Sequence, residues 1–187
     1  MKKILIIAIV LFLSWQTTLL YNTLVTKQEA VDSAFSQVQS NIQRKADLLE
    51  NLVQTLSRYV KYEKNLLTKI TELRSEVKNQ PKTNNNIQKV GSLNKQLQGI
   101  THTLLLSVEN YPDLKASEQF LELQAQIEGS ENRINITRMN YNEAVKEYNT
   151  LLKKFPYNLI AKIVDFQQKP YYKVTTKTDT NYQIKIQ

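Results

Sequence analysis

The chain has 187 residues, with 3 Gly, 4 Pro, 1 His and no Cys, and its formal charge is +8. The length suits one domain with one core, and the absence of cysteine excludes disulfides, thiolate metal ligands, cysteine nucleophiles and a lipid-modified N-terminal cysteine. The basic excess suits an anionic membrane surface or an acidic partner, although a solvated surface is the simpler explanation.

An apolar run opens the chain. Lys2 and Lys3 precede apolar residues 4–15, and the run continues to residue 21 with few polar interruptions. Eighteen residues rising about 1.5 Å each give roughly 27 Å, close to the hydrocarbon thickness of a bilayer. The residues after the run match a signal-peptide cleavage site poorly, so residues 1–25 are predicted to be an uncleaved single-pass anchor, with a cleaved signal as the alternative. Because Lys27 is the only basic residue in the next twenty, we expect a cytoplasmic N-terminus and an extracytoplasmic body.

A helical body is predicted over residues 26–168. Thr26 and Glu29 have capping-box spacing, so a helix either begins there or continues straight from the anchor. Lys45 and Glu63 interrupt the apolar pattern and are expected to be exposed at its edge, with pairing to a neighbouring helix as the alternative. The first helix is predicted to end at residues 79–86, which contain Pro81 and consecutive Asn. Its apolar residues recur at alternating three- and four-residue steps, the mark of one helix face: Phe35, Val38, Ile42, Leu49, Leu52, Leu56, Tyr59, Leu66, Ile70, Leu73 and Val77.

Three further helices and a tail are predicted downstream. A second helix over residues 87–109 has a buried face of Leu93, Leu97, Ile100, Leu104 and Val108, and residues 111–117 form a connection. A third helix covers residues 117–155, since large side chains recur there every seven positions: Phe120, Ile127, Ile134, Tyr141, Tyr148 and Phe155. A short fourth helix follows over 157–166. The tail, residues 169–187, is predicted to be mobile or strand-prone because Tyr182, Ile184 and Ile186 alternate.

An asparagine row accompanies the third helix. Asn135, Asn142 and Asn149 each follow one residue of the seven-residue repeat. Amides beside a helix seam can hydrogen-bond across helices and fix their register. We expect this structural use, with ligand binding as the alternative.

A family resemblance is carried by residues 21–25, 31–35, 44–53, 111–134, 141–161 and 169–172. In these segments the sequence resembles the LemA family of bacterial membrane-anchored proteins. The resemblance implies a bundle of long antiparallel helices on an N-terminal membrane segment, in a family without an established enzymatic activity. Phe35, Glu50 and Tyr62 stand where the family usually has Trp, Pro and His, and Arg44-Lys45 replaces its Arg-Arg pair. The change from Pro to Glu suggests a straighter first helix.

Charged residues inside the family-like segments are the remaining candidates for a site. We expect them to form interhelical ion pairs, because a charge desolvated beside a seam needs a partner: Arg44, Asp47, Glu131, Arg133 and Arg138. A metal site of the di-iron type is not expected, because His102 has no Glu three residues before it. No phosphate-binding loop or nucleophile motif occurs, and scattered Lys and Arg residues do not favour nucleic-acid binding.

The sequence therefore predicts an all-α protein, an antiparallel, four-helix, up-and-down-like bundle on an N-terminal transmembrane helix. The expected function is that of a non-enzymatic, cofactor-free scaffold or interaction protein of the bacterial cell envelope. Its partners would be the membrane and an unidentified protein or a second copy of the chain. The alternative is membrane-surface binding or remodelling through basic amphipathic helices.

Overall fold

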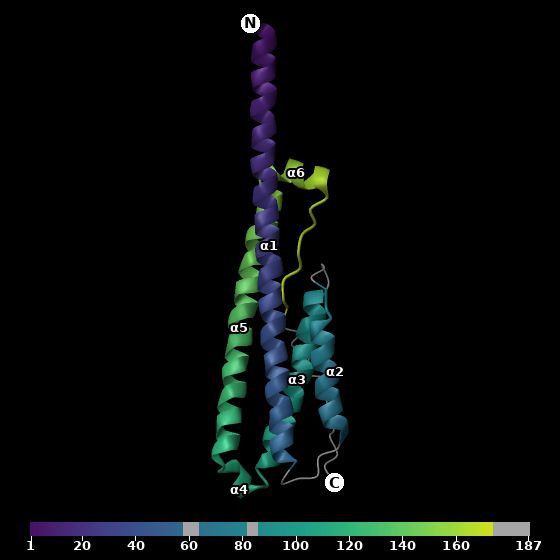
Figure 1. Ribbon diagram of the computed structural model, residues 1–187, viewed down its shortest axis with the longest axis vertical. Helices are drawn as coiled ribbons and strands as arrows, with labels where there is room; N and C mark the ends of the chain where they lie inside the picture. Colours follow the sequence, from purple (N-terminus) through teal and green to yellow (C-terminus); the bar gives the residue numbers. More distant parts are fainter. Residues whose placement is uncertain (58–63, 82–85, 174–187) are drawn as a thin grey trace.

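The computed structural model describes residues 1–57, 64–81 and 86–173. Its helices are α1 (Lys2–Leu56), α2 (Lys64–Lys78), α3 (Asn86–Val108), α4 (Pro112–Lys115), α5 (Glu118–Lys153) and α6 (Tyr157–Val164). The described part contains no β-strand, so the predicted all-α class is confirmed. Helix α1 runs along most of the molecule and contacts α2, α3, α5 and α6, while the chain reverses direction between successive long helices (Figure 1).

The apolar stripes predicted from the sequence form one core. All five apolar residues predicted for the second helix are buried on α3, and so are the first five of the seven-residue repeat on α5. The sixth, Phe155, is 79% exposed because α5 ends at Lys153, just before Pro156, which cannot continue a helix. The predicted seam is therefore wrong at Phe155. The described members of the first stripe are all buried: Phe35, Val38, Ile42, Leu49, Leu52, Leu56, Leu66, Ile70, Leu73 and Val77.

The single long helix predicted to end at residues 79–86 is wrong. Helix α1 ends at Leu56, and α2 begins at Lys64 and packs back against α1. Tyr59, Tyr62 and Glu63 lie outside the described residues. Hydrophobic periodicity continues across the break because both helices turn their apolar faces to the same core. Periodicity therefore reports which residues are buried but not where the chain reverses.

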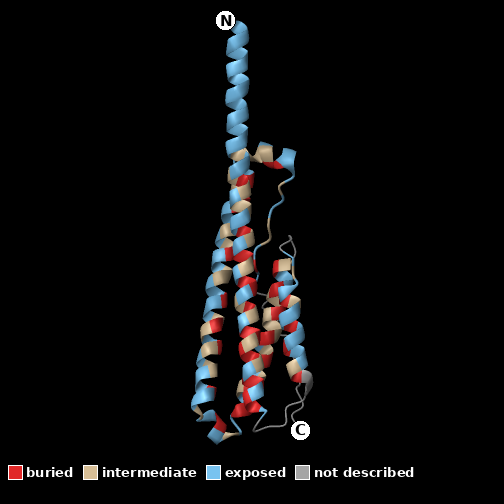
Figure 2. Cartoon of the chain, viewed as in Figure 1, coloured by how far each residue is buried: buried red, intermediate tan, exposed pale blue. Residues whose placement is uncertain are grey.

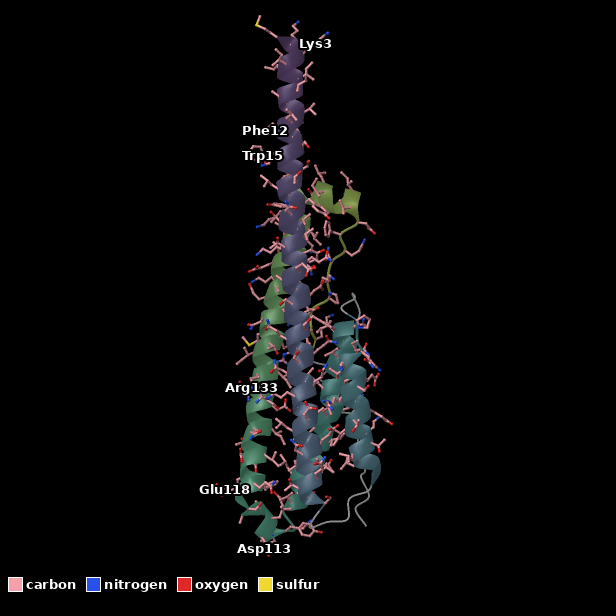
Figure 3. The ribbon with its side chains drawn as sticks, in the orientation of Figure 1. Lys3, Phe12, Trp15, Asp113, Glu118 and Arg133 are labelled. Atoms are coloured by element: carbon pink, nitrogen blue, oxygen red, sulfur yellow. The ribbon has the colours of Figure 1, made fainter. Side chains whose placement is uncertain are left out.

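Helix α1 passes from the apolar run into the bundle without interruption. The Thr26 hydroxyl donates to the carbonyl oxygen of Asn22 at 2.8 Å, so Thr26 lies inside the helix and does not cap a new one. Among the described residues, α1 alone is long and apolar enough to cross a membrane, and its most apolar window is entirely unburied. Figure 2 shows that this exposed part projects beyond the other helices, and Phe12 and Trp15 extend from it without neighbours (Figure 3).

Gln39 ties the end of α2 to α1. Its buried side-chain amide Nε2 donates to the carbonyl oxygens of Val77 (2.9 Å) and Gln80 (2.8 Å). The last carbonyl groups of a helix have no partner within the helix. The Val77 carbonyl also accepts from the Gln80 backbone N–H at 3.3 Å. Gln39 therefore adds donors to carbonyl groups at and just beyond the end of α2, and it fixes the position of that end along α1.

Lys45 is buried in the core, contrary to the expected exposed position. Its side chain is 0% exposed and forms an ion pair with Glu131 of α5, whose side chain is largely covered. Burial lowers the pKa of Lys45 below its ordinary value, while Glu131 opposes that shift. Removing Glu131 leaves the ammonium group of Lys45 buried without a counter-charge, whereas removing Lys45 leaves Glu131, whose side chain is 28% exposed and can still be solvated.

We predict that Glu131→Gln destabilises the protein by about 3 kcal/mol, more than Lys45→Met does. In the Glu131→Gln variant, the unfolded state holds the Lys45 proton more tightly than the folded state. Its stability deficit should therefore shrink as pH rises toward 10.5, the ordinary lysine pKa. Denaturant unfolding in detergent as a function of pH measures both effects. Equal losses for the two variants at neutral pH would contradict the assignment.

Candidate functional site along helix α5

Asn142 and Asn149 of α5 hold the segment that follows α6, residues 166–173, which we call the C-terminal strap. The side-chain Nδ2 of Asn149 donates to the Lys169 carbonyl oxygen (2.8 Å), and the Lys169 backbone N–H donates to Asn149 Oδ1 (2.9 Å). Asn142 makes the same pair of bonds with Tyr172, at 3.2 and 2.8 Å. Each amide therefore satisfies both backbone groups of one strap residue.

The spacing of the two asparagines matches the geometry of the strap. Seven helical residues advance about 10 Å, and three extended residues advance about the same distance. Asn142 and Asn149 are seven residues apart, and the strap residues they bind, Lys169 and Tyr172, are three apart. The seven-residue spacing of Asn142 and Asn149 on the helix thus matches the three-residue spacing of their partners in the extended strap.

The turn into the strap is made at Asp165. Its φ of 62° places it in the left-handed region at the end of α6, a conformation that Asp tolerates better than most residues. The strap then runs back along the bundle (Figure 1). Lys169 Nζ lies 3.4 Å from Asp32 Oδ1 of α1, and the Tyr141 hydroxyl donates to the Pro170 carbonyl oxygen at 2.9 Å.

Tyr172 is the buried end of the described strap. It is 8% exposed, and the guanidinium carbon of Arg138 lies 5.6 Å from its ring centre, within the range of a cation–π contact. A Cβ atom at Gly91 of α3 would lie 3.2 Å from Tyr172 Cζ, so the glycine makes room for the ring. Gln88 of α3 also donates through Nε2 to the Tyr171 carbonyl oxygen at 2.6 Å. The strap therefore contacts α1, α3 and α5 together.

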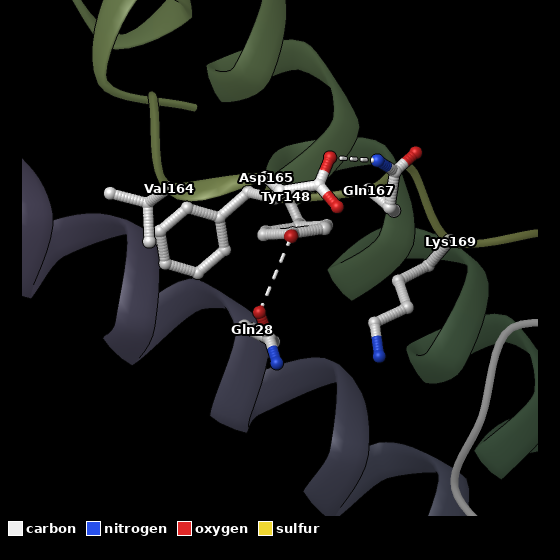
Figure 4. Close-up of a pocket in the computed structure, with 7 residues that line it drawn as sticks. Gln28, Tyr148, Val164, Asp165, Gln167 and Lys169 are labelled. Atoms are coloured by element: carbon white, nitrogen blue, oxygen red, sulfur yellow. Dashed lines mark hydrogen bonds between the residues drawn. The ribbon is translucent and has the colours of Figure 1, made fainter. Parts of the chain in front are cut away.

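A cavity of about 290 Å³ lies between the start of the strap, α1 and α5. Figure 4 shows Tyr148 reaching toward Gln28 of α1, and the two are joined by a hydrogen bond of 3.4 Å. Asp165 accepts a hydrogen bond from Gln167 on the same wall. Burial raises the pKa of Tyr148 to about 12, so its phenol stays protonated at neutral pH. The polar groups of the cavity are mostly engaged with one another, which suits holding the strap in place.

The five charged residues singled out in the sequence have different surroundings. Glu131 pairs with Lys45, and Asp47 Oδ1 lies 2.6 Å from Nε of Arg74 on α2. Both are interhelical pairs, although neither joins two of the five. Arg138 contacts the Tyr172 ring instead of a carboxylate. Arg44 and Arg133 are exposed and make no ion pair within the described residues, and Arg133 points away from the bundle in Figure 3. The expected pairing is therefore wrong for Arg44 and Arg133, because neither is desolvated.

The three asparagines of the row also have different surroundings. Asn142 and Asn149 bond to the strap instead of a neighbouring helix. Asn135, seven residues before Asn142 on α5, is exposed and has no hydrogen bond to the described residues. Residues 169–173 of the predicted tail are held against the bundle, and its alternating residues 182–186 lie outside the described part.

Sequence reasoning missed several residues that position the strap and the helices. Gln39, Asp32 and Gly91 carry no distinctive motif, and their roles depend on contacts distant in the sequence. The burial of Lys45 could have been predicted, because Lys45 stands between Ile42 and Leu49 at a position of the buried apolar repeat. Among the described residues, no three His, Asp or Glu side chains gather as metal ligands would.

Together, the fold and the site define an all-helical protein with one helix able to cross a membrane and a C-terminal segment strapped onto its bundle. The LemA family profile matches residues 34–187, and the chain belongs to the LemA family. Protein LemA of Metamycoplasma hominis is 30% identical over 146 residues, which cover 77% of this chain but 64% of that relative.

Two relatives carry a different name. Magnetosome protein MamQ 2 of Paramagnetospirillum magneticum is 25% identical over 201 residues, covering 95% of this chain and 74% of that protein. Magnetosome protein MamQ of Magnetospirillum gryphiswaldense is 23% identical over 203 residues, covering 96% and 75%. These similarities and the apolar part of α1 indicate a membrane-associated helical protein.

Asn149→Ala and Asn142→Ala should each destabilise the protein by about 1–3 kcal/mol, because each leaves a backbone N–H and carbonyl group of the strap without partners. Asn135→Ala is the matched control from the same row, and its effect should stay within about 0.5 kcal/mol. Hydrogen exchange of the Lys169 and Tyr172 amides should accelerate in the corresponding variant. Unchanged exchange at both amides would refute the clamp.

Alkaline pH should weaken the fold partly through Tyr148. Its pKa is about 12 when folded and 10.0 ordinarily, so the folded state retains a proton that the unfolded state loses. That contribution is fully present below pH 10 and disappears as pH rises from 10 toward 12. Tyr148→Phe should therefore lose less stability over this interval than the parent chain, measured by unfolding at each pH. Parallel curves would argue against a buried phenol.

Proposed function

We propose that this chain is a single-pass, membrane-anchored helical scaffold of the bacterial cell envelope. The observation that carries the proposal is the continuity of α1. Its N-terminal part is apolar and unburied, whereas residues from Leu24 to Leu56 supply much of the core. One helix is therefore both the anchor and the member against which α2, α3 and α5 pack as an antiparallel four-helix bundle.

A rod of this kind holds its far end at a set distance from the bilayer. The 55 residues of α1 extend about 80 Å, of which roughly 30 Å would cross the hydrocarbon core. The remaining length carries the bundle outward. Support for a non-enzymatic role comes from the strap site, whose polar groups bind the chain's own backbone. The bundle would present its outer surface to a protein partner or to a second copy of the chain.

The orientation follows from the charges at the anchor. Lys2 and Lys3 precede the apolar part, while Lys27 is the first basic residue after it. Basic residues accumulate on the cytoplasmic side. We therefore place the N-terminus in the cytoplasm and the bundle outside.

Membrane fractionation of cells expressing Val10→Lys/Leu13→Lys tests the anchor. Two charges at the centre of a span are strongly unfavourable, so this variant should move from the carbonate-resistant membrane fraction to the soluble one. Gln37→Lys, on the exposed face of the same helix within the bundle, should remain in the membrane. Release of the unaltered chain by carbonate would defeat the proposal.

Protease treatment of spheroplasts tests the orientation separately. The added protease should degrade the bundle from outside. Without protease, the mass of the membrane-bound chain should match the full sequence, with at most the first methionine removed. A protected bundle would reverse the orientation, and a product lacking the apolar run would show a cleaved signal.

A further inference from the structure

Helix α6 carries an apolar face without a partner among the described residues. Leu159 is 50% exposed and Ile163 81%, and their four-residue spacing places them on one side of α6. Phe155, which is 79% exposed, lies in the turn before α6, one residue ahead of its N-cap Pro156. The opposite side packs on the core through Tyr157, Ile160 and Ala161. Such a helix has apolar residues on both faces, whereas solvent would favour a polar outer one.

The position of α6 is as informative as its composition. It lies across the direction of α1, at the level where the unburied apolar part of α1 begins (Figures 1 and 2). The ring centres of Tyr21 on α1 and Phe166 just after α6 are 6.0 Å apart, which fixes this level. Tyr21 ends the apolar run, and tyrosine is enriched at membrane interfaces.

The charges around α6 complement an anionic surface. Lys153, Lys154 and Lys162 are all exposed, and Asp165 is the one acidic residue between residues 153 and 165. Lys162 adjoins the apolar face, so its stem can lie along that face while its ammonium group reaches the head groups. Lys27, Lys146 and Lys154 line a neighbouring surface hollow together with Glu147. Lys27 pairs with Glu147 and Lys146 with Glu143, so the hollow adds little positive charge beyond that of Lys154.

We propose that α6 lies in the membrane interface, with Phe155, Leu159 and Ile163 among the lipids and its lysines at anionic head groups. This inference rests on the proposed anchoring by α1, which would hold α6 at head-group depth. An apolar face flanked by lysines and oriented across the anchor is the arrangement of an interfacial helix. The membrane, continuous with the anchor itself, is the occupant of the face.

Lipid quenching of tryptophan fluorescence tests the proposal on the full-length chain. Trp15 is the only tryptophan, so the unaltered protein reports the anchor and a Trp15→Phe/Ile163→Trp variant reports α6. Each is reconstituted in vesicles of phosphatidylcholine and phosphatidylglycerol containing lipids brominated on the acyl chains. We expect quenching at both positions, whereas Trp15→Phe/Leu121→Trp, at an exposed apolar position near the start of α5, should show none.

The outcomes separate the two proposals. Quenching of Trp15 without quenching at position 163 overturns the interfacial helix but leaves the anchor intact. No quenching of Trp15 overturns the anchor. Blue-shifted emission at position 163 that brominated lipid leaves unchanged would assign the face to a second copy of the chain, and so would also overturn the proposal.

A charge variant tests the head-group contact. Lys153→Gln/Lys154→Gln/Lys162→Gln, combined with Trp15→Phe/Ile163→Trp, should reduce quenching in phosphatidylglycerol vesicles to the level seen in phosphatidylcholine alone. Added salt should have the same effect on the lysine-containing form, because exposed charges are screened. Quenching that is equal in both lipids for both forms would remove the lysines from the proposal.

Discussion

Packing against α1 is the constraint on which the rest of the structure depends. Helices α2, α3, α5 and α6 all contact it, so its buried residues must serve several neighbours at once. The apolar residues from Leu24 to Leu56 are therefore distributed around more of the helix than a single seam requires. Lys45 is the charged exception among these buried residues, and among the described residues its ammonium group pairs with Glu131 of α5.

Periodicity predicted the composition of the core well but the path of the chain poorly. The described residues of the first stripe, from Phe35 to Val77, are buried as expected. Yet they belong to two helices, since apolar spacing records the face that meets the core and not the direction of the helix. Leu56 and Leu66 keep the same rhythm on opposite sides of a reversal. The sequence between Leu56 and Lys64 contains no Gly or Pro, so no helix-breaking residue predicts the end of α1.

The site was predictable only as a pattern of residue types. The recurring amides of Asn142 and Asn149 indicated a regular structural contact, but the sequence could not show that the partner is an extended backbone. Any residue whose backbone N–H and carbonyl groups are free can bond to such an amide. The partner residue therefore has no characteristic side chain that the sequence would reveal. Gly91 is similar, because its role is the space it leaves for Tyr172.

The strap and α6 act on the same end of the molecule. Helix α6 is held at its start by the end of α5, at its finish by Tyr21 through Phe166, and beyond that by the two asparagine clamps. Its short length gives it little stability of its own, so these attachments keep it helical and fix its outward face. The extended segment that follows α6 thereby helps to fix which surface α6 turns away from the bundle. Asn142 and Asn149 on α5 thus act on the apolar face of α6 beside the anchor, because they hold the strap that positions α6.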